Sequence, residues 1–455
     1  MKTQVAIVGG GPGGSACALY LARLGVKSVI IEREVFPRYH IGESMTGEAG
    51  GLLRDLGFEH QMITNRHPVK HGVSVWGTNG KNQWFVPVMQ RLADGTLRDQ
   101  VTWQVRRSQF DTMLLDAAIA AGATLVDGRA MQPIVDDKNV LRGAHVLMSD
   151  GGRQVIESEV LLDCSGQATW LANRGIAGPK YLGAYDKQIA IFSQVTGLQR
   201  DAGGTMREKQ PGNTLIFIKE KYHWAWVIPI DDEVTSVGVV APSQYYLGKR
   251  ESKHDYLARE LKELNPALSA RLPEVKFVED IHVIPNYSLQ VTNFAGPGYI
   301  CVGDAHRFLD PIFSFGLYLT MKEAALLAPI VCEFLNGKFR DSKNPFEDHM
   351  IRIERGADII EDLIDAFWEN PLAFALFAHM RHREDFIDVL AGRVFDVTAS
   401  PGVEACRELL MRARTYERGG HYSMPIGSRF QPERAPIWKS GFDSVQATET
   451  WMRDE

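Results

Sequence analysis

The sequence predicts an α/β fold in which a Rossmann-like domain contains an inserted, mostly antiparallel β-sheet domain and precedes a helical C-terminal region. Three observations predict it. A glycine-rich turn joins an apolar strand to a helix near the N-terminus, short β segments with turns fill two later stretches, and helical periodicity runs from Leu317 to about Val397. At 455 residues the chain exceeds what one hydrophobic core organises, so two or three packed regions are expected.

The N-terminal unit is predicted to be strand, turn, helix and strand. An apolar run at residues 4–8 predicts the first strand, and helical spacing over residues 15–24 predicts a helix that ends at Gly25. A second buried strand is expected at residues 28–31. This order is typical of a nucleotide-binding α/β unit.

The turn in this unit has the G-x-G-x-x-G spacing of a dinucleotide site. The first glycine permits the turn, the second lets the backbone approach a pyrophosphate, and the third lets the helix pack closely on the strand. The helix N-terminus favours the diphosphate charge. At the end of the second strand, the Glu32 carboxylate can accept hydrogen bonds from adenosine ribose hydroxyls. The expected cofactor contacts here are Gly9, Gly11, Gly13, Gly14, Glu32 and Arg33.

Later elements follow from the same periodicities. Helices are expected at residues 46–56 and 107–121, with short β segments between residues 70 and 104 that turn at Asn79-Gly80 and Asp94-Gly95. Strands are expected at residues 124–127, 160–164 and 299–302, and residues 188–241 are predicted to be β-rich. The tail after Gly419 has little periodicity and is expected to wrap the surface or fray.

Composition excludes several classes of protein. The net charge of -6 gives no excess of positive charge with which to bind nucleic acid or an anionic membrane. No apolar run reaches the roughly 20 residues of a membrane span, and the early first strand leaves no room for a signal peptide. The five cysteines include no CxxC pair, so no metal site is predicted. A cytoplasmic monomer or homodimer is expected.

Three segments indicate which dinucleotide is bound. Residues 106–111 look like the Arg-x-x-Phe-Asp helix start of flavin monooxygenases, residues 162–166 resemble their Asp-x-Ser-Gly strand end, and residues 303–305 resemble their Gly-Asp-Ala segment. The resemblance implies FAD rather than NAD, with Asp304 bonded to the ribityl chain and Arg107 against the cofactor. A surface arginine and an N-capping aspartate are the alternatives for these residues taken singly.

The segment His223–Pro229 adds a more specific resemblance. Trp224 and Trp226 are two residues apart on an expected strand, so they point to one face and can form a flat wall, or an inert core pair. With the glycine-rich turn, Gly303-Asp304 and residues 310–316, this set resembles the flavin-dependent halogenases of the phenol and pyrrole type, over residues 1–395. The resemblance implies a FAD-binding domain of the flavin monooxygenase type.

The resemblance also implies the catalytic groups. Lys70 matches the essential lysine, which would hold hypohalous acid as an ammonium or trap it as a haloamine, since a desolvated lysine reaches both forms. Trp224 and Trp226 would keep substrate off the flavin. A surface lysine is the alternative for Lys70, and Lys81 is a weaker candidate. The segment of residues 38–44 would close over the flavin; the further cofactor contacts are Ile41, Gly42, Glu43, Ser44, Arg107, Asp304, Pro311, Gly316 and Leu317.

Halide is expected where backbone N–H groups converge at a helix start. By resemblance, the N–H groups of Phe315 and Gly316 are the donors for chloride or bromide, and Ser314 is the fourth catalytic candidate. Ser314 is also expected to be a plain N-cap of the helix beginning near Leu317.

Two positions depart from the family's pattern. Tryptophan halogenases have a glutamate where this chain has Phe313, which favours a substrate ring that activates itself, such as a phenol or pyrrole, free or tethered to a carrier protein. His223 replaces the usual glycine before Trp224, which puts the local geometry of the wall in doubt.

The predicted organisation has three parts. The FAD-binding domain comprises residues 1–75, 100–185 and 280–330, the β-sheet substrate domain residues 76–99 and 186–279, and the helical region and tail residues 331–455. A single dinucleotide fingerprint implies a separate NAD(P)H-dependent flavin reductase that supplies FADH2. The alternatives to a halogenase are a flavin monooxygenase or hydroxylase, a geranylgeranyl-reductase-like oxidoreductase, and a flavoprotein that only binds or senses.

Overall fold

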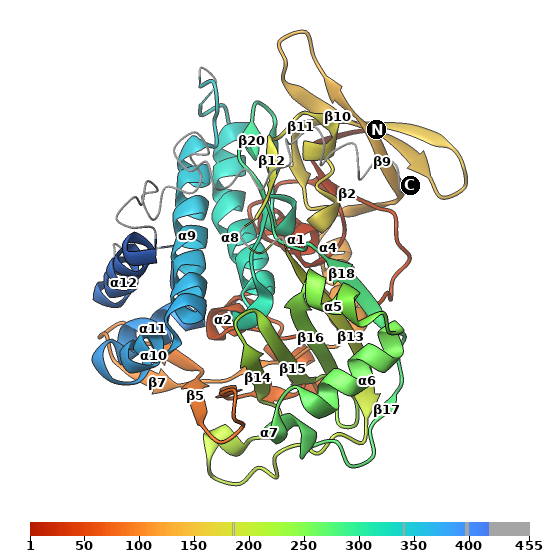
Figure 1. Cartoon of the computed structure of the whole chain (residues 1–455). Coiled ribbons are helices and arrows are strands. Elements are labelled where there is room, and N and C mark those ends of the chain that lie inside the picture. Colours follow the sequence, from red (N-terminus) through yellow and green to blue (C-terminus); the bar gives the residue numbers. More distant parts are fainter. Residues whose placement is uncertain (184, 186, 340–341, 396–399, 418–455) are drawn as a thin grey trace.

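The computed structural model describes residues 1–183, 185, 187–339, 342–395 and 400–417 (Figure 1). The first sheet has a parallel centre, in which β1 (Lys2–Val8) pairs with β2 (Ser28–Glu32) on one side and with β11 (Arg153–Asp163) on the other. Every residue of β2 is buried, as expected of a parallel strand covered on both faces.

The outer strands complete this sheet. β9 (Thr124–Val135) pairs in parallel with β2, and β21 (Tyr299–Cys301) pairs in parallel with β11. The edge strand β20 (Ala295–Gly296) runs antiparallel to β21. Helix α1 (Pro12–Arg23) is the crossover from β1 to β2, so the predicted strand–turn–helix–strand unit is present.

An antiparallel extension of this sheet was not predicted. β9 and β11 continue past the parallel centre and pair with β10 (Leu141–Met148) between them. Along β9 and β11 exposed and buried residues alternate outside the parallel part. The expected strands at residues 124–127 and 160–164 therefore covered only one end of each, because the alternating part lacks a continuous apolar run.

Helices cover the parallel sheet. α1, α4 (Arg107–Ala120) and α8 (Gly316–Leu335) pack against one another beside it (Figure 1). Two shorter helices, α2 (Gly47–Asp55) and α3 (Glu59–Thr64), follow the segment that leaves β2. The Thr46 hydroxyl accepts a hydrogen bond from the Ala49 N–H and so caps α2.

The second sheet has eight strands and lies below the first in the view of Figure 1. Its central strands β13, β16, β15 and β14 are antiparallel neighbours, and β14 pairs in parallel with β4. The strands are β4 (Gly72–Trp76), β5 (Gln83–Pro87), β13 (Gln188–Thr196), β14 (Thr214–Glu220), β15 (His223–Pro229), β16 (Thr235–Pro242), β17 (Lys276–Phe277) and β18 (His282–Pro285).

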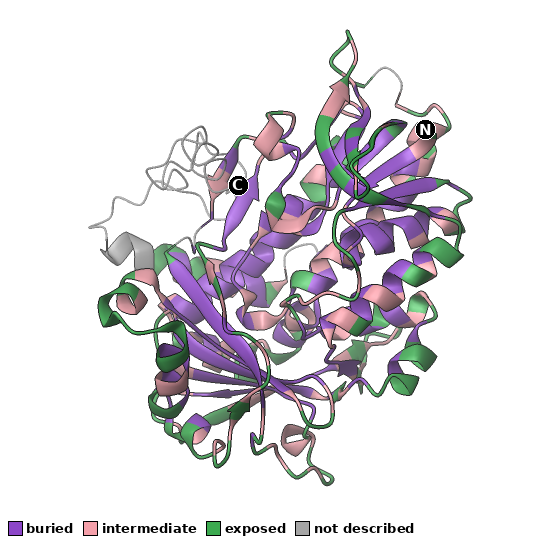
Figure 2. Cartoon of the chain, turned by 90° about the vertical axis from the view of Figure 1, so that its right-hand side faces the viewer, coloured by how far each residue is buried: buried purple, intermediate pink, exposed green. Residues whose placement is uncertain are grey.

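Both faces of the central strands β13, β15 and β16 of the second sheet are buried (Figure 2). Ala225 and Val227 of β15 belong to the hydrophobic cluster of α6 (Lys253–Glu263), while Trp224 and Trp226 belong to the core shared with the parallel sheet. The outer helices α5 (Ser243–Lys249), α6 and α7 (Pro266–Ser269) were not predicted.

Short strand pairs link these layers. β3 (Val69–Lys70) pairs with β8 (Thr102–Trp103), and β6 (Met89–Arg91) pairs with β7 (Leu97–Asp99). A third small sheet contains β12 (Lys180–Leu182), β19 (Leu289–Val291) and β22 (Arg307–Phe308). The first of these pairs matters most for the site, because it positions Lys70.

The C-terminal region is helical, as predicted. It contains α9 (Glu347–Glu369), α10 (Pro371–Leu376), a π-helical turn (Phe377–Arg381), α11 (Arg383–Ala391) and α12 (Pro401–Glu417). The end of the predicted helical stretch at Val397 and the tail after Gly419 lie outside the described residues. The three-part division of the chain stays a prediction. Among the helices of the described residues, none combines the length and apolar composition needed to cross a bilayer.

Candidate functional site

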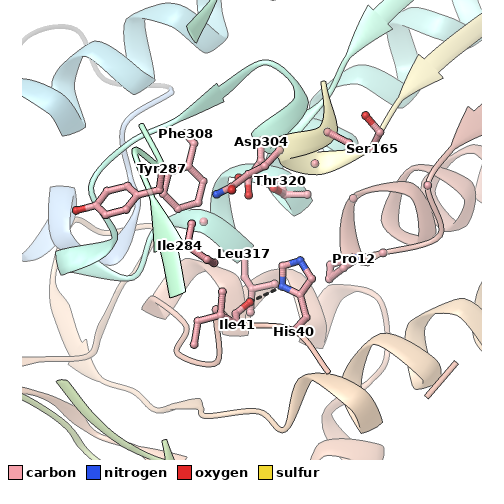
Figure 3. Close-up of a pocket in the computed structure, with 18 of the residues that line it drawn as sticks. Pro12, His40, Ile41, Ser165, Ile284, Tyr287, Asp304, Phe308, Leu317 and Thr320 are labelled. Carbon is pink, nitrogen blue, oxygen red and sulfur yellow. Dashed lines mark hydrogen bonds between the residues drawn. The ribbon is translucent and has the colours of Figure 1, made fainter. Parts of the chain in front are cut away.

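One cavity of about 1660 Å³ lies between the two sheets. That volume exceeds the range of roughly 300–1,000 Å³ common for small-molecule pockets. Pro12 and Ser165 lie at one end of the view in Figure 3, Tyr287 and Phe308 at the other, and Asp304 between them. An elongated ligand of dinucleotide size fits this arrangement.

The glycine-rich turn lines one end of the cavity. Gly9 has a φ of 102°, and a Cβ on it would lie 2.4 Å from the Cys164 carbonyl oxygen, so glycine is required there. Gly11 and Gly13 line the cavity, and a Cβ on Gly11 would meet the Arg38 guanidinium at 3.4 Å. Gly14 lies behind the wall, where a Cβ would lie 1.9 Å from the Gly9 oxygen. It permits helix–strand packing.

Glu32 and Arg33 line the cavity beside this turn. The Glu32 carboxylate accepts hydrogen bonds from the N–H of Gly10 at 2.5 Å and from the N–H of Glu34 at 2.7 Å. It therefore holds the glycine-rich turn against β2 in addition to facing the cavity. A carboxylate with two oxygens has lone pairs left for ribose hydroxyls, so the predicted role fits.

Arg107 anchors the segment that closes the cavity. Its guanidinium makes a two-pronged contact with the buried Asp111, at 2.7 and 2.9 Å, and also donates to the Ile41 carbonyl. Ile41 and Gly42 line the cavity with Arg107 itself. Burial and the nearby Arg107 charge lower the pKa of His40 to about 4, so this cavity-lining imidazole is neutral at pH 7. His40 lies in the segment predicted to close over the flavin but was not itself among the predicted contacts.

The buried Glu43 and the partly buried Asp304 line the cavity with their carboxyl groups, and both have free hydrogen-bonding capacity. Burial raises the pKa of Asp304 to about 7 and that of Glu43 to about 7. The Gln194 amide donates to one oxygen of Glu43 at 3.2 Å, and the other oxygen finds no partner among the described residues. Such groups suit a ligand rich in hydroxyl and N–H donors, which describes the ribityl chain and ring of a flavin. The residues present fit FAD.

Trp224 and Trp226 form the predicted wall. Their ring centroids are 5.8 Å apart with planes inclined by 50°, and both rings line the cavity from β15. The Trp226 indole N–H donates to Ser236 at 3.2 Å, which fixes the ring. His223 points to the opposite face, where its Nε2 lies 3.0 Å from the Glu260 carboxylate. The histidine therefore leaves the wall undisturbed, because adjacent side chains of a strand face opposite ways.

Lys70 is buried, with 2% of its surface exposed. Its Nζ donates to the Ser44 hydroxyl at 2.8 Å and to the Met45 carbonyl at 2.8 Å. Burial lowers its pKa to about 7, so ammonium and free amine coexist near neutral pH. Ser44 lines the cavity, which places the amine one side chain behind the cavity wall. The weaker candidate Lys81 is exposed in a turn.

The loop before α8 brings Pro311, Ser314, Phe315, Gly316 and Leu317 to the cavity. The expectation that Ser314 caps α8 is wrong: Phe315 is the N-cap, and Ser314 has a left-handed φ of 62° at the end of a short 3-10 helix (Pro311–Phe313). This conformation turns the chain so that the amides of Phe315 and Gly316 start α8. Neither N–H donates to backbone within the described part of the chain, so both are available to an anion.

Phe313 occupies a cluster of aromatic rings rather than a polar site. It stacks on Phe374 with planes inclined by 6° and meets Phe367 edge-on. Trp84 joins the same cluster through Phe367 and Phe374. A carboxylate at position 313 would be surrounded by apolar rings, which agrees with its absence from the sequence.

Several cavity residues carried no signal in the sequence. Ile284, Tyr287 and Phe308 line the end opposite the glycine-rich turn (Figure 3). Thr214 lines the cavity at the start of β14 and bonds to Ser44, and the buried Gln104 bonds to Thr214. These residues lie outside the predicted motifs and their types are ordinary for β segments, so only the fold could select them.

The comparisons with known proteins agree with this geometry. Residues 2–343 match the FAD binding domain family. A brominase of 1H-pyrrole-2-carbonyl groups on a peptidyl-carrier protein, from Pseudoalteromonas luteoviolacea, is 35% identical over 86% of this chain and 92% of that protein. The corresponding chlorinase of Pseudomonas fluorescens is 28% identical over 90% of this chain and 93% of that protein. The solved structure of the flavin-dependent brominase Bmp2 is 34% identical, covers 92% of this chain and 100% of its own, and has a TM-score of 0.83.

Proposed function

Because the chain belongs to the FAD binding domain family and, within it, to the flavin-dependent halogenases, we propose that Lys70 delivers the halogen to an electron-rich aromatic ring. Bound FADH2 supplies two electrons with which O2 and halide give hypohalous acid and water. Lys70 then binds the hypohalous acid and passes its halogen to the substrate. The observation that carries the proposal is the burial of Lys70 behind the wall of the flavin cavity, with its amine bonded to the cavity-lining Ser44.

Two forms of Lys70 can perform the transfer. As an ammonium, it donates a hydrogen bond to the hypohalous oxygen, and the halogen then moves to the ring carbon while the ring loses a proton and water leaves. As a free amine, it forms an N–halogen bond and releases water; the halogen then passes to the ring carbon, and the proton that the ring loses restores the amine. The pKa of Lys70 of about 7 makes both forms accessible.

The wall of Trp224 and Trp226 supports halogenation over direct oxygenation. An aromatic substrate in contact with the flavin could receive oxygen, whereas a small anion such as chloride or bromide can reach the oxidant past bulky rings. Both indoles are nearly fully buried, so they hold their places by packing. The free N–H groups of Phe315 and Gly316 support a halide site beside this wall, with Ser314 as the residue that sets the turn.

The substrate class follows from position 313 and from the relatives. Apolar rings surround Phe313, so no carboxylate at that position assists ring deprotonation. A pyrrole or phenol ring supplies that activation itself. Since two relatives act on pyrrole-2-carbonyl groups tethered to a peptidyl-carrier protein, we infer a pyrrole of this kind as the first substrate to try.

A separate NAD(P)H-dependent flavin reductase completes the cycle. The sequence has one dinucleotide fingerprint, and the cavity that contains Gly9 and Gly11 suits the flavin itself. All five cysteines are free thiols, which supports the predicted cytoplasmic location.

The test is halide-dependent mass gain. Purified protein, FADH2 from an added reductase, O2 and each halide are incubated with carrier-tethered pyrrole, free pyrroles and phenols. The proposal expects products with the isotope pattern of bromine or chlorine. Oxygen incorporation without halide, or reduction of a double bond, would instead identify a monooxygenase or a reductase of the same fold.

A further inference from the structure

The amine of Lys70 meets the flavin cavity through a hydroxyl group. Ser44 and Thr214 line the cavity, whereas Lys70 is not among its lining residues. The Lys70 Nζ donates to the Ser44 Oγ at 2.8 Å. Ser44 is therefore shared between the cavity wall and the surroundings of the amine.

The Ser44 hydroxyl is held by hydrogen bonds that run through Thr214 to Gln104. The Gln104 side-chain nitrogen donates to the Gly212 carbonyl at 3.1 Å, and because that carbonyl can only accept, the amide orientation is set. The same nitrogen donates to the Thr214 hydroxyl at 2.8 Å. The Thr214 and Ser44 oxygens are 2.9 Å apart. The Ser44 and Thr214 hydroxyls thus link Gln104 to Lys70, and either hydroxyl can donate in the bond between them.

The backbone pairs the segments that carry three of these four residues. Ser44 and Gln104 form an isolated antiparallel bridge, so both residues lie on paired segments. Lys70 of β3 is in register with Thr102 of β8, two residues before Gln104. All members are buried: Gln104 is 0%, Thr214 2%, Lys70 2% and Ser44 6% exposed. Hydrogen bonds in a buried network of this kind restrict the side chains that they join, and the Gln104 Oε1 is the member atom that finds no partner among the described residues.

Two acceptors leave one free direction on the Lys70 nitrogen. The bonds to the Ser44 Oγ and the Met45 carbonyl use two N–H groups. A tetrahedral nitrogen bonded to Cε then has one vertex left, which holds the third N–H in the ammonium and the lone pair in the free amine. The same vertex thus serves both chemical forms of Lys70.

We propose that Ser44 is the positioning residue of Lys70, and that Thr214 and Gln104 hold its hydroxyl so that the one free vertex of the amine is aimed at the oxidant. The inference rests on the proposed role of Lys70 in halogen delivery. Ser44 acts through the lysine: without its hydroxyl, the amine keeps the Met45 bond alone and rotates about Cε–Nζ. The oxidant then escapes into solvent more often than it reaches substrate.

Other ionisable groups lie on the segments around Lys70, so the test must report on the lysine itself. Glu43 precedes Ser44, and burial raises its pKa to about 7, close to that of Lys70. Burial lowers the pKa of His67 to about 4 and also lowers that of His71. Other charged groups nearby are Glu48, Arg54 and Asp55 of α2 and Arg207, which donates to the His71 carbonyl.

The variant pair Thr214→Val and Thr214→Ser separates hydroxyl from packing. Valine keeps the volume and removes the bond to Ser44, and serine keeps the hydroxyl. Ser44→Ala removes the positioning group directly. Ser193→Ala is the control, because Ser193 is equally buried, lies outside the cavity lining and bonds to the Glu279 carbonyl.

The first readout needs neither flavin nor substrate. The protein is labelled with 13C at lysine Cε, and the Lys70 signal, assigned by its loss in Lys70→Met, is titrated by NMR. Ser44→Ala removes a hydrogen-bond acceptor from the Lys70 ammonium and so disfavours its charged form. The pKa of Lys70 should therefore fall by about one pH unit. Thr214→Val should shift the pKa of Lys70 in either direction by less than Ser44→Ala does. Thr214→Ser and Ser193→Ala should leave that pKa unchanged.

The second readout is the fate of the oxidant. With FADH2, O2 and bromide, Ser44→Ala and Thr214→Val should give at least tenfold less halogenated product per FADH2 consumed, and should release hypohalite that a soluble diketone traps. Normal product yield and an unshifted Lys70 titration in Ser44→Ala would overturn the positioning role while leaving halogenation intact. An inactive wild-type protein with every halide would instead overturn the proposed function.

Discussion

Trp226 and Gly238 lie opposite each other on β15 and β16, and the outer edge of the indole lies over the glycine backbone. A Cβ at position 238 would be 2.3 Å from the two nearest ring atoms of Trp226 and 2.6 Å from the Phe192 Cβ. Real side chains do not approach so closely, so the cavity wall that Trp226 forms depends on a glycine in the neighbouring strand.

Gly238→Ala should therefore push the Trp226 ring toward the cavity. Overpacking of this kind costs about 1–3 kcal/mol in the free energy of unfolding. We expect weaker FAD binding and a lower urea midpoint, measured by flavin fluorescence and by circular dichroism. Gly248→Ala is the control, because a Cβ there meets no atom within 4 Å. Unchanged FAD affinity in Gly238→Ala would show that the ring has room to move.

Trp224→Ala should change the product rather than abolish turnover. Loss of the indole opens the cavity wall and lets an aromatic substrate approach the flavin, so the ratio of halogenated to oxygenated product should fall. Mass spectrometry of the products under 18O2 measures that ratio. Trp76→Ala removes a buried indole from the outer-face cluster of the second sheet and should leave the ratio unchanged. A constant ratio in Trp224→Ala would mean that the wall does not exclude substrate.

Lys70→Met should reveal the cost of burying the ammonium. The folded-state pKa of Lys70 is about 7, below its ordinary 10.5, so between these values the unfolded chain binds more protons and wild-type stability rises with pH. Methionine cannot titrate. The stability of Lys70→Met relative to wild type should therefore be highest below pH 7 and fall by roughly 1.4 kcal/mol per pH unit above it.

Urea unfolding of both proteins at pH 6, 7, 8 and 9 measures this slope. Because both proteins contain all the other ionisable groups, the contribution of those groups to the pH dependence of stability cancels in the difference. These groups include Glu43, whose pKa lies in the same range. A stability difference that does not change with pH would show that the amine is solvated in the folded protein.

Asp304→Asn should weaken FAD binding. A carboxylate that accepts hydroxyl hydrogen bonds contributes about 1.5–3 kcal/mol, so the FAD dissociation constant should rise roughly 10- to 150-fold. Fluorescence titration of the apoprotein measures it. Asp116→Asn, on an exposed position of α4, is the control and should bind FAD normally. Equal affinity in Asp304→Asn would remove Asp304 from the cofactor site.

The motifs predicted one end and the middle of the cavity better than the end opposite the glycine-rich turn, where Tyr287 and Phe308 lie. Gly9, Asp304 and Trp226 belong to segments whose residue types are set by tight turns, cofactor contact or bulk, so they can be recognised locally. Thr214 and Gln104 could not be predicted, because hydrogen bonding between distant strands selected them.

The fold follows the same rule. Continuous apolar runs predicted the parallel strands, whereas β10 and the outer helices α5–α7 were missed, since alternating or mixed patterns resemble surface loops. The prediction that Ser314 caps α8 was wrong. A serine before a helix is a common N-cap, and only the backbone geometry shows that the next residue, Phe315, takes that position.

Lys70→Ala is the most direct test of the account. With FADH2, O2 and bromide, it should bind FAD with unchanged affinity, form hypobromite that a soluble trap detects, and give no brominated pyrrole or phenol. Lys81→Ala, in an exposed turn, should brominate normally. Bromination by Lys70→Ala at the wild-type rate would contradict delivery of the halogen by this lysine.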